Sequence, residues 1–173
     1  MRIDPTLENV RTLNAAYADH DTDAPLRALS ERVRAHRELN LSDLEVVCRW
    51  KSPRALPRVR RNTDSEVREV TRWALSTPQE RMRLESLLML HGVSWPTASV
   101  VLHWFHSDPY PILDVRALWS LGFGVPSTYT FEFWWQYVTT CRDLSGRLSL
   151  PMRDLDRALW QYSRNAGGPG TAR

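Results

Sequence analysis

The stretch Leu87–Asp114 reads LLMLHGVSWPTASVVLHWFHSDPYPILD, and it decides the fold of the chain. Its pattern predicts a helix that runs to Gly92, a tight turn at Gly92 and Val93, and a second helix with an apolar stripe. A loop spaced by prolines follows and ends on one carboxylate, Asp114. Such an arrangement can hold a nucleic-acid backbone and place a carboxylate beside it.

Helical periodicity recurs along almost the whole chain, and no segment shows the alternation of a strand. Capping boxes predict helix starts at Ser42, Thr63 and Thr77. The prolines at 53 and 57 predict an irregular connection between helices. One helix face is largely aromatic and is expected to be buried: Phe131, Trp134, Trp135 and Val138. We therefore predict an all-α protein, a compact bundle of eight or nine helices.

The chain has 173 residues, 42% hydrophobic and 25% charged, the balance of a globular protein with a buried core. We expect one domain over residues 1–165 and a disordered tail over 166–173. No apolar run approaches membrane-spanning length and the first residues lack the core of a signal peptide, so we expect a cytoplasmic protein. Cys48 and Cys141 are too few for a cysteine-built metal site, and we expect two buried thiols and no metal.

Arginine dominates the positive charge of the chain. The net charge of +3 and the pI of about 9.2 are only mildly basic, but 22 arginines accompany a single lysine, Lys51. Biased codon usage is the simpler explanation, although arginine suits bidentate phosphate contacts better than lysine does. Six cations lie between Glu45 and Asp64, where no acid occurs: Arg49, Lys51, Arg54, Arg58, Arg60 and Arg61. A solvated charge run and a phosphate-binding edge both fit this cluster.

The nine residues LHGVSWPTA at 90–98 resemble a helix-hairpin-helix DNA-binding motif, whose pattern is apolar-x-Gly-apolar-Gly-x-x-x-Ala. Gly92 permits the positive φ of the turn, and amides at the start of the second helix point toward a phosphate. The second glycine of the pattern is Ser94 here. The expected DNA-binding residues are His91, Gly92, Val93, Ser94, Thr97, Arg54, Arg58, Arg60 and Arg61.

The continuation of this motif to Gly122 resembles the helix-hairpin-helix DNA glycosylase superfamily, in its endonuclease III and MutY branch. Those enzymes have an essential aspartate at a fixed distance after the hairpin, and the endonuclease-III-like ones have a catalytic lysine just before the Thr-Ala pair. Here Pro96 takes the place of the lysine, and Asp114 follows it by 18 residues, the spacing of the family. The resemblance implies a core at about 64–122 with flanking helices in 1–50 and 130–165. The four cysteines that hold an iron–sulfur cluster in many relatives are absent.

By this resemblance the protein is a monofunctional glycosylase that binds double-stranded DNA, flips a damaged or modified base and hydrolyses its N-glycosidic bond. Asp114 is the expected catalytic residue, and Pro96 removes the amine that would form a Schiff base. No cofactor is implied, although a monovalent cation can be accommodated at the hairpin, and we expect a monomer that joins the nucleoid when bound to DNA. The candidates for the base pocket are Trp50, Lys51, Ser52 and Trp95.

Several alternatives remain open from the residues themselves. An aspartate before an apolar helix is also an ordinary N-cap, and Asp114 can serve in both roles. Lys51 is a surface lysine, a DNA contact or, least favoured, a replacement nucleophile. A non-catalytic helix-hairpin-helix DNA-binding module and a helical interaction protein are the other functions considered, and the mild net charge favours the second of these.

Overall fold

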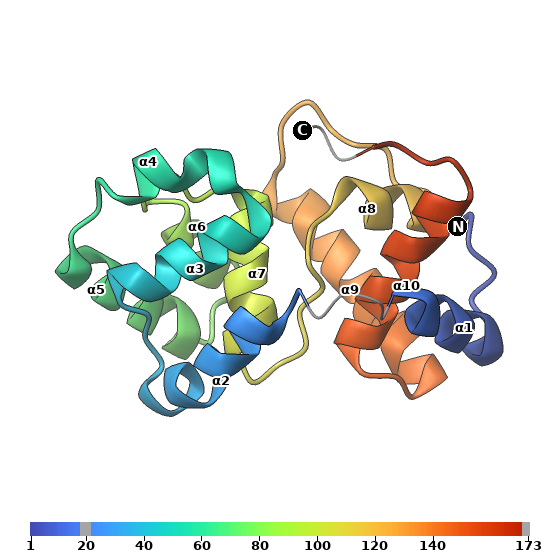
Figure 1. The fold of residues 1–173 in the computed structure, drawn as a ribbon, viewed down its shortest axis with the longest axis horizontal. Coiled ribbons are helices and arrows are strands. Elements are labelled where there is room, and N and C mark those ends of the chain that lie inside the picture. Colours follow the sequence, from blue (N-terminus) through green and yellow to red (C-terminus); the bar gives the residue numbers. More distant parts are fainter. Residues whose placement is uncertain (18–21, 171–173) are drawn as a thin grey trace. The chain divides into compact units, whose positions relative to one another are not determined.

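The computed structural model describes residues 1–17 and 22–170. These residues form ten α-helices, one short 3-10 helix and no strand, which confirms the all-α prediction (Figure 1). The number of helices exceeds the expected eight or nine because the connection with Pro53 and Pro57 is not irregular. It forms the 3-10 helix η1 (Pro53–Ala55) and the short helix α4 (Leu56–Val59), since proline fits the first turn of a helix. None of the described helices combines the length and the hydropathy that a membrane span requires.

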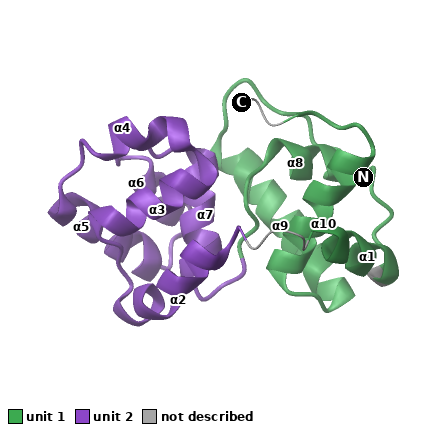
Figure 2. Cartoon of the chain, viewed as in Figure 1, with its two compact units in different colours: residues 1–21, 110–173 green, residues 22–109 purple. Residues whose placement is uncertain are grey.

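The helices group into two compact units (Figure 2). Unit 1 comprises residues 1–21 and 110–173, and unit 2 comprises residues 22–109. The division falls after Pro109, so the hairpin belongs to unit 2 and Asp114 belongs to unit 1. The single domain over 1–165 stays a prediction. Of the expected tail, residues 171–173 lie outside the described residues, while the Gly168 N–H donates to the Ser163 carbonyl at 2.8 Å.

Unit 2 is built around one central helix, α7. Its predicted apolar stripe is buried as expected, and Val100 on the flank of that stripe is buried too. Helices α2, α3 and α6 all pack against α7, and α5 packs against α3 and α6. The α-helices of unit 2 besides α4 are α2 (Ala24–His36), α3 (Leu41–Lys51), α5 (Asp64–Ser76), α6 (Glu80–Leu87) and α7 (Trp95–Phe105).

Unit 1 is built around the C-terminal helix. Helix α10 packs against α1, α8 and α9, and the Ser120 hydroxyl of α8 donates to the Leu159 carbonyl of α10 at 2.6 Å. On α9 the expected aromatic face is turned from its predicted position. Trp134 and Val138 are fully buried, whereas Phe131 and Trp135 are half-buried because Tyr137 takes the inner position beside Trp134. The helices of unit 1 are α1 (Leu7–Tyr17), α8 (Val115–Leu121), α9 (Phe131–Leu148) and α10 (Met152–Asn165).

Two of the three predicted capping boxes differ from the structure. The box at Thr63 is confirmed: the Thr63 hydroxyl accepts from the Glu66 N–H, and the Glu66 carboxylate accepts from the Thr63 N–H. Helix α3 begins earlier than predicted because Asn40, not Ser42, is its N-cap, with Asp43 completing the box. Helix α6 begins later than predicted, after Gln79, which makes no side-chain cap. The side chains of Ser42 and Thr77, the two other predicted N-caps, make other local contacts.

The C-terminal end of α6 also differs from the prediction, which extended this helix to Gly92. The helix ends at Leu87, and residues 88–90 continue as tight turns. The N–H groups of Leu88, Met89 and Leu90 each donate to the carbonyl three residues earlier. The backbone is therefore wound more tightly than an α-helix just before the turn at Gly92.

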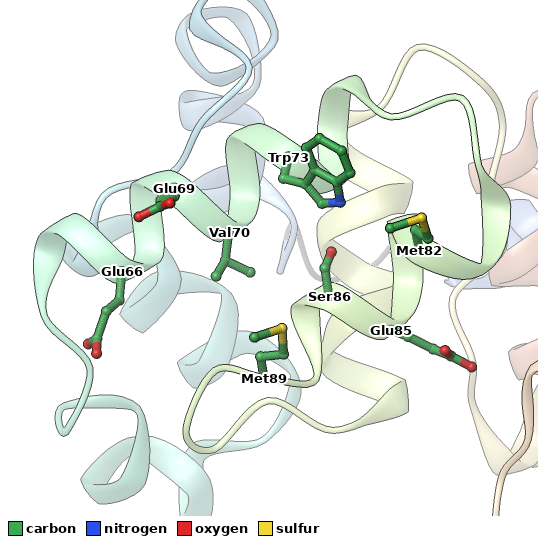
Figure 3. Close-up of a pocket in the computed structure, with 8 residues that line it drawn as sticks. All are labelled: Glu66, Glu69, Val70, Trp73, Met82, Glu85, Ser86 and Met89. Atoms are coloured by element: carbon green, nitrogen blue, oxygen red, sulfur yellow. The ribbon is translucent and has the colours of Figure 1, made fainter.

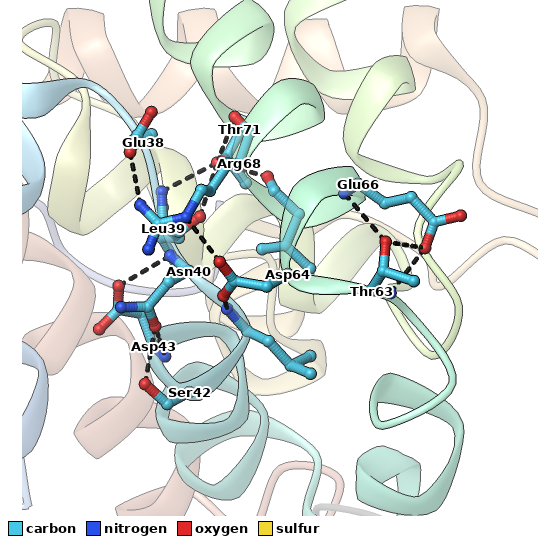
Figure 4. A network of polar contacts seen from close by, with 12 residues as sticks. Glu38, Leu39, Asn40, Ser42, Asp43, Thr63, Asp64, Glu66, Arg68 and Thr71 are labelled. Carbon is cyan, nitrogen blue, oxygen red and sulfur yellow. Dashed lines mark hydrogen bonds and ion pairs between the residues drawn. The ribbon is translucent and has the colours of Figure 1, made fainter.

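A polar network joins the linker between α2 and α3 to the start of α5 (Figure 4). The Asp64 carboxylate accepts from the Leu41 N–H at 2.9 Å and from Arg68 at 2.6 Å. Arg68 and Arg72 both donate to Glu38. These contacts lower the pKa of Glu38, through its two arginine bonds, and the pKa of Asp64, first through the Leu41 N–H and then through Arg68. The network therefore requires ionised carboxylates.

We predict that acid weakens unit 2 through this network. Because the folded-state pKa values are depressed, the contribution of these groups is fully present above the ordinary values of 4.5 for Glu38 and 3.8 for Asp64, and it is lost as the pH falls through the folded values. Glu38→Gln should lower the midpoint of urea denaturation at pH 7. It should also reduce the difference between the midpoint at pH 7 and the midpoint measured below the ordinary pKa of Glu38.

The matched control is Glu69→Gln, an exposed carboxylate on α5 that makes no ion pair with any described residue. It should leave both midpoints unchanged. Equal acid sensitivity in Glu38→Gln and the wild type would contradict the assignment.

Candidate nucleic-acid interface and catalytic carboxylate

The hairpin turn between α6 and α7 depends on Gly92, whose φ is +80°. A Cβ at this position would lie 2.8 Å from the Val59 backbone nitrogen and 3.0 Å from the Ala55 carbonyl oxygen. Both the left-handed backbone and the close approach exclude a side chain. The turn therefore packs directly on the segment formed by η1 and α4.

Asn62 fastens the turn to that segment. Its side-chain carbonyl accepts from the His91 N–H at 2.8 Å, and its amide donates to the His91 carbonyl at 3.0 Å and to the Val59 carbonyl at 2.7 Å. The side chain is buried, so these bonds replace water that it cannot reach. Asn62 is the most important residue that sequence reasoning missed. Nothing in the local sequence marks a partner 29 residues away.

The start of α7 is open to an acceptor from outside the chain. Ser94 occupies the N-cap position, but its side chain makes no capping bond, and Pro96 has no N–H. Ser94 is exposed and Trp95 is half-buried, so backbone donors lie at an accessible helix start, where the helix dipole favours an anion. The other two hairpin candidates lie inward. Val93 and Thr97 are buried, and the Thr97 hydroxyl lies 3.5 Å from the Ser94 hydroxyl, so both shape the turn.

The structure separates four of the six cations of the basic cluster into two groups. Arg49 and Arg60 both bind Glu45, at 2.6 Å and 3.1 Å, so this carboxylate neutralises part of the cluster from the preceding helix. Arg58 and Arg61 are exposed and make no ion pair with any residue in the described ranges. Val59 and Asn62 contact the hairpin turn directly. Arg58 and Arg61 are their neighbours in the chain, so they lie on the same short segment that supports Gly92. The hairpin and the free part of the cluster form one edge, which we call the Gly92 edge.

The remaining candidates of unit 2 lie at the ends of helices. Trp50 and Lys51 are half-buried in the last turn of α3, and Ser52 is its C-cap, with its N–H bonded to the Cys48 carbonyl. Arg54 is exposed in η1. Helix α3 packs against η1, α4 and α7, so these candidates come from the elements that support the Gly92 edge.

In unit 1, Asp114 is the N-cap of α8 and is half-buried. Its carboxylate accepts from the Arg116 N–H at 2.9 Å. The Asp114 backbone is extended, with φ −141° and ψ 139°. Its carboxylate affects the pKa of two tyrosine hydroxyls. Burial raises the pKa of Tyr129 and of Tyr137, and the Asp114 charge raises both further. Asp114 is thus a carboxylate fixed at a helix start near two phenols that remain neutral at physiological pH.

The four residues that precede Asp114, residues 110–113, are buried. Tyr110, Ile112 and Leu113 are at most 2% exposed. The Tyr110 ring stacks on Trp134 with ring centres 5.8 Å apart, and the Tyr137 hydroxyl donates to the Ile112 carbonyl at 2.9 Å. Residues 110–113 are therefore held against α9, which constrains the backbone just before Asp114.

The other titratable candidates have structural roles. Asp108 is an exposed residue of the turn after α7, and its N–H donates to His106 Nδ1 at 2.9 Å. Cys48 and Cys141 are buried thiols that form no disulfide, and burial raises the pKa of both. Among residues 1–17 and 22–170, no three His, Cys, Asp or Glu side chains gather as a metal site would require.

Comparisons with known proteins give one distant match. No family model matches the chain, and no curated protein sequence matches it. The chain is similar to the 8-oxoguanine glycosylase/lyase of Methanocaldococcus jannaschii, whose crystal structure contains a 15mer DNA with 8-oxoguanine. The sequences are 14% identical, the match covers 95% of this chain and 91% of that chain, and the TM-score is 0.49. A likeness at this level does not decide the function of this chain.

We predict that Gly92→Ala destabilises unit 2 by more than about 2 kcal/mol, because alanine must adopt a left-handed backbone and its Cβ meets the Val59 backbone. Urea denaturation followed by circular dichroism measures the loss. The control is Gly146→Ala, in the exposed interior of α9, where an added Cβ meets nothing within 4 Å. That change should be neutral or stabilise by about 0.5–1 kcal/mol. Equal stability of Gly92→Ala and the wild type would show that the turn does not need glycine.

Proposed function

We propose that the protein binds duplex DNA and excises a damaged or modified base by hydrolysing its N-glycosidic bond, with Asp114 as the catalytic carboxylate. The single observation that carries the proposal is the fixed carboxylate at the N-cap of α8, 18 residues after Pro96, at the end of a buried loop. The resemblance of the hairpin to a helix-hairpin-helix motif supports the choice of DNA as substrate.

The Gly92 edge is the proposed backbone-binding surface. The open start of α7 at Ser94 offers amide donors and a favourable dipole to a phosphate, and the exposed Arg58 and Arg61 add charge on the adjoining segment. His91 is exposed at the turn and adds a further phosphate contact. Because these groups contact phosphate and not base edges, they position the protein on the duplex without reading its sequence.

Asp114 acts on the sugar of the flipped nucleotide. As the bond from C1′ to the base nitrogen breaks, the base leaves with the electron pair and positive charge develops on the sugar, which a fixed anion stabilises. Water then adds at C1′, and Asp114 orients that water or takes its proton. Pro96 supplies no amine, so no Schiff base forms there and the strand is left uncut at the abasic site. Trp50, Lys51, Ser52 and Trp95 are the proposed pocket residues.

One observation favours a second candidate function. The bond from the Arg116 N–H gives Asp114 a structural role that explains the residue without catalysis. A DNA-binding module that uses the Gly92 edge alone would fit the same structure. The two functions differ in whether a base is released.

We predict that Arg58→Ala and Arg61→Ala each weaken duplex binding and reduce the slope of log K against log salt concentration by about 1, because each removes one phosphate contact. Fluorescence anisotropy with a labelled duplex at several salt concentrations measures both. Arg11→Ala in α1 is the control, since it makes the same charge change at an exposed site of unit 1. If Arg11→Ala changes the slope as much as the other two, the Gly92 edge is not the binding surface.

We predict that Asp114→Asn abolishes base release while leaving stability and duplex binding unchanged. Asparagine still accepts the Arg116 N–H as an N-cap, so this variant removes the charge and keeps the structural role. Duplexes with uracil, 8-oxoguanine, alkylated purines or mismatches are incubated with protein and then treated with alkali, and strand breakage reports base release.

Asp108→Asn is the matched control, because it neutralises an exposed carboxylate six residues earlier in the chain. It should retain wild-type release. Equal breakage by Asp114→Asn and the wild type would remove Asp114 from catalysis. Borohydride trapping that disappears in Lys51→Ala would overturn the monofunctional assignment.

A further inference from the structure

Helices α5 and α6 form a helical hairpin with an open groove of about 580 Å³ between them (Figure 3). None of the residues that line it is among those assigned to DNA. Val70 and Trp73 of α5 and Met82, Ser86 and Met89 on the α6 side point toward one another across it. Most of the surface that they present is apolar. The groove is therefore lined like the binding surface for another apolar chain, yet no described residue covers it.

Exposed hydrophobic side chains gather in this groove and not elsewhere on unit 2. Trp73 is 51% exposed, Met82 is 48% exposed and Met89 is 76% exposed. Two other large hydrophobic residues have comparable exposure, Met1 and Val125, and both belong to unit 1. Single exposed apolar residues need no explanation, but a cluster with a polar border is typical of an interaction site.

The spacing of the lining residues fits a helical occupant. On α5 they lie at positions 66, 69, 70 and 73, and on the opposite side at 82, 85, 86 and 89. Each set runs i, i+3, i+4, i+7, so the groove is two helical turns long, about 10 Å. A short amphipathic helix places its apolar side chains at the same repeat. Two methionines let the walls adapt to side chains of different shape.

The charged residues at the border of the groove indicate which kind of partner binds there. The three charged residues of the groove are Glu66, Glu69 and Glu85. Glu69 makes no ion pair with any described residue. Hydrogen bonds from Thr63 hold the pKa of Glu66 below its ordinary value, so it is ionised, and Glu85 is paired with Arg81 at an exposed site, where screening makes such a pair weak. This border repels a nucleic-acid backbone and attracts lysine and arginine.

We propose that this groove docks a short amphipathic helix of a partner protein, whose apolar face fills the space around Trp73 and whose flanking lysines or arginines pair with the glutamates. The occupant is small, so the complex is transient, with a dissociation constant on the order of micromolar. The proposal does not depend on base excision. It gives unit 2 a protein-binding surface of charge opposite to that of the Gly92 edge.

A displayed peptide library tests the proposal without knowledge of the partner. The library holds helices of about 14 residues, with apolar residues at i, i+3 or i+4, and i+7, and with random flanking charges. It is selected on the full chain and counter-selected on Trp73→Ala. Enrichment of peptides rich in lysine and arginine is the expected result. No enrichment, or enrichment of acidic flanks, overturns the proposal.

The strongest selected peptide is then labelled and titrated by fluorescence anisotropy. Trp73→Ala and Met89→Ala should each weaken its binding at least about tenfold, the loss of one well-packed anchor. Glu69→Lys should also weaken it and should weaken it less at high salt. Val125→Ala, an equally exposed truncation in unit 1, is the control and should bind as the wild type does.

Three further readouts separate the alternatives. Thermal denaturation should show that the variants at Trp73, Met89 and Glu69 fold, because all three side chains are exposed. Trp73→Ala should keep wild-type affinity for duplex DNA, so failure of this proposal and failure of the DNA proposal give different results. Sedimentation that shows a dimer of the wild type, lost in Trp73→Ala, would overturn the proposal in favour of a second copy of this chain as the occupant.

Discussion

Unit 2 depends on the close approach of the Gly92 backbone to the backbone of Val59. The approach is open to glycine alone, and the buried Asn62 side chain holds the turn there by bonding both the N–H and the carbonyl of His91. Together these contacts make the hairpin and the segment of Arg58 and Arg61 one rigid edge. Residues on a flexible loop would lose conformational entropy on binding a phosphate, whereas the Gly92 edge is ordered beforehand.

The features that sequence predicted correctly are those set by neighbouring residues. The stripe of α7, the capping box at Thr63, the need for glycine at 92 and the N-cap geometry of Asp114 all follow from spacing within one helical turn or from one backbone angle. The features that it missed depend on distant partners. Arg60 looked free until α3 brought Glu45 beside it across 15 residues, and the aromatic face of α9 turned because Tyr137 satisfies the Ile112 carbonyl. No local pattern carries that information.

Charge is divided between surfaces of the same unit. Positive side chains without carboxylate partners adjoin the Gly92 turn, while glutamates border the apolar groove between α5 and α6. A modest net charge therefore hides two surfaces of opposite preference, and it is a poor guide to what the protein binds. The carboxylate of Asp114 belongs to neither surface. It is fixed by its own helix start and by the buried residues 110–113 before it.

The chain order of the two units has a consequence for how the protein forms during translation. Residues 22–109 are continuous, so α2 to α7 can pack as soon as this segment has left the ribosome. Unit 1 is discontinuous: α1 precedes unit 2 in the chain, whereas its packing partner α10 follows unit 2. The apolar face of α1 must stay unburied while some 130 residues are synthesised, and closing so long a loop is slow. The apolar face of α1 is thus exposed to aggregation for longer than the faces buried within unit 2.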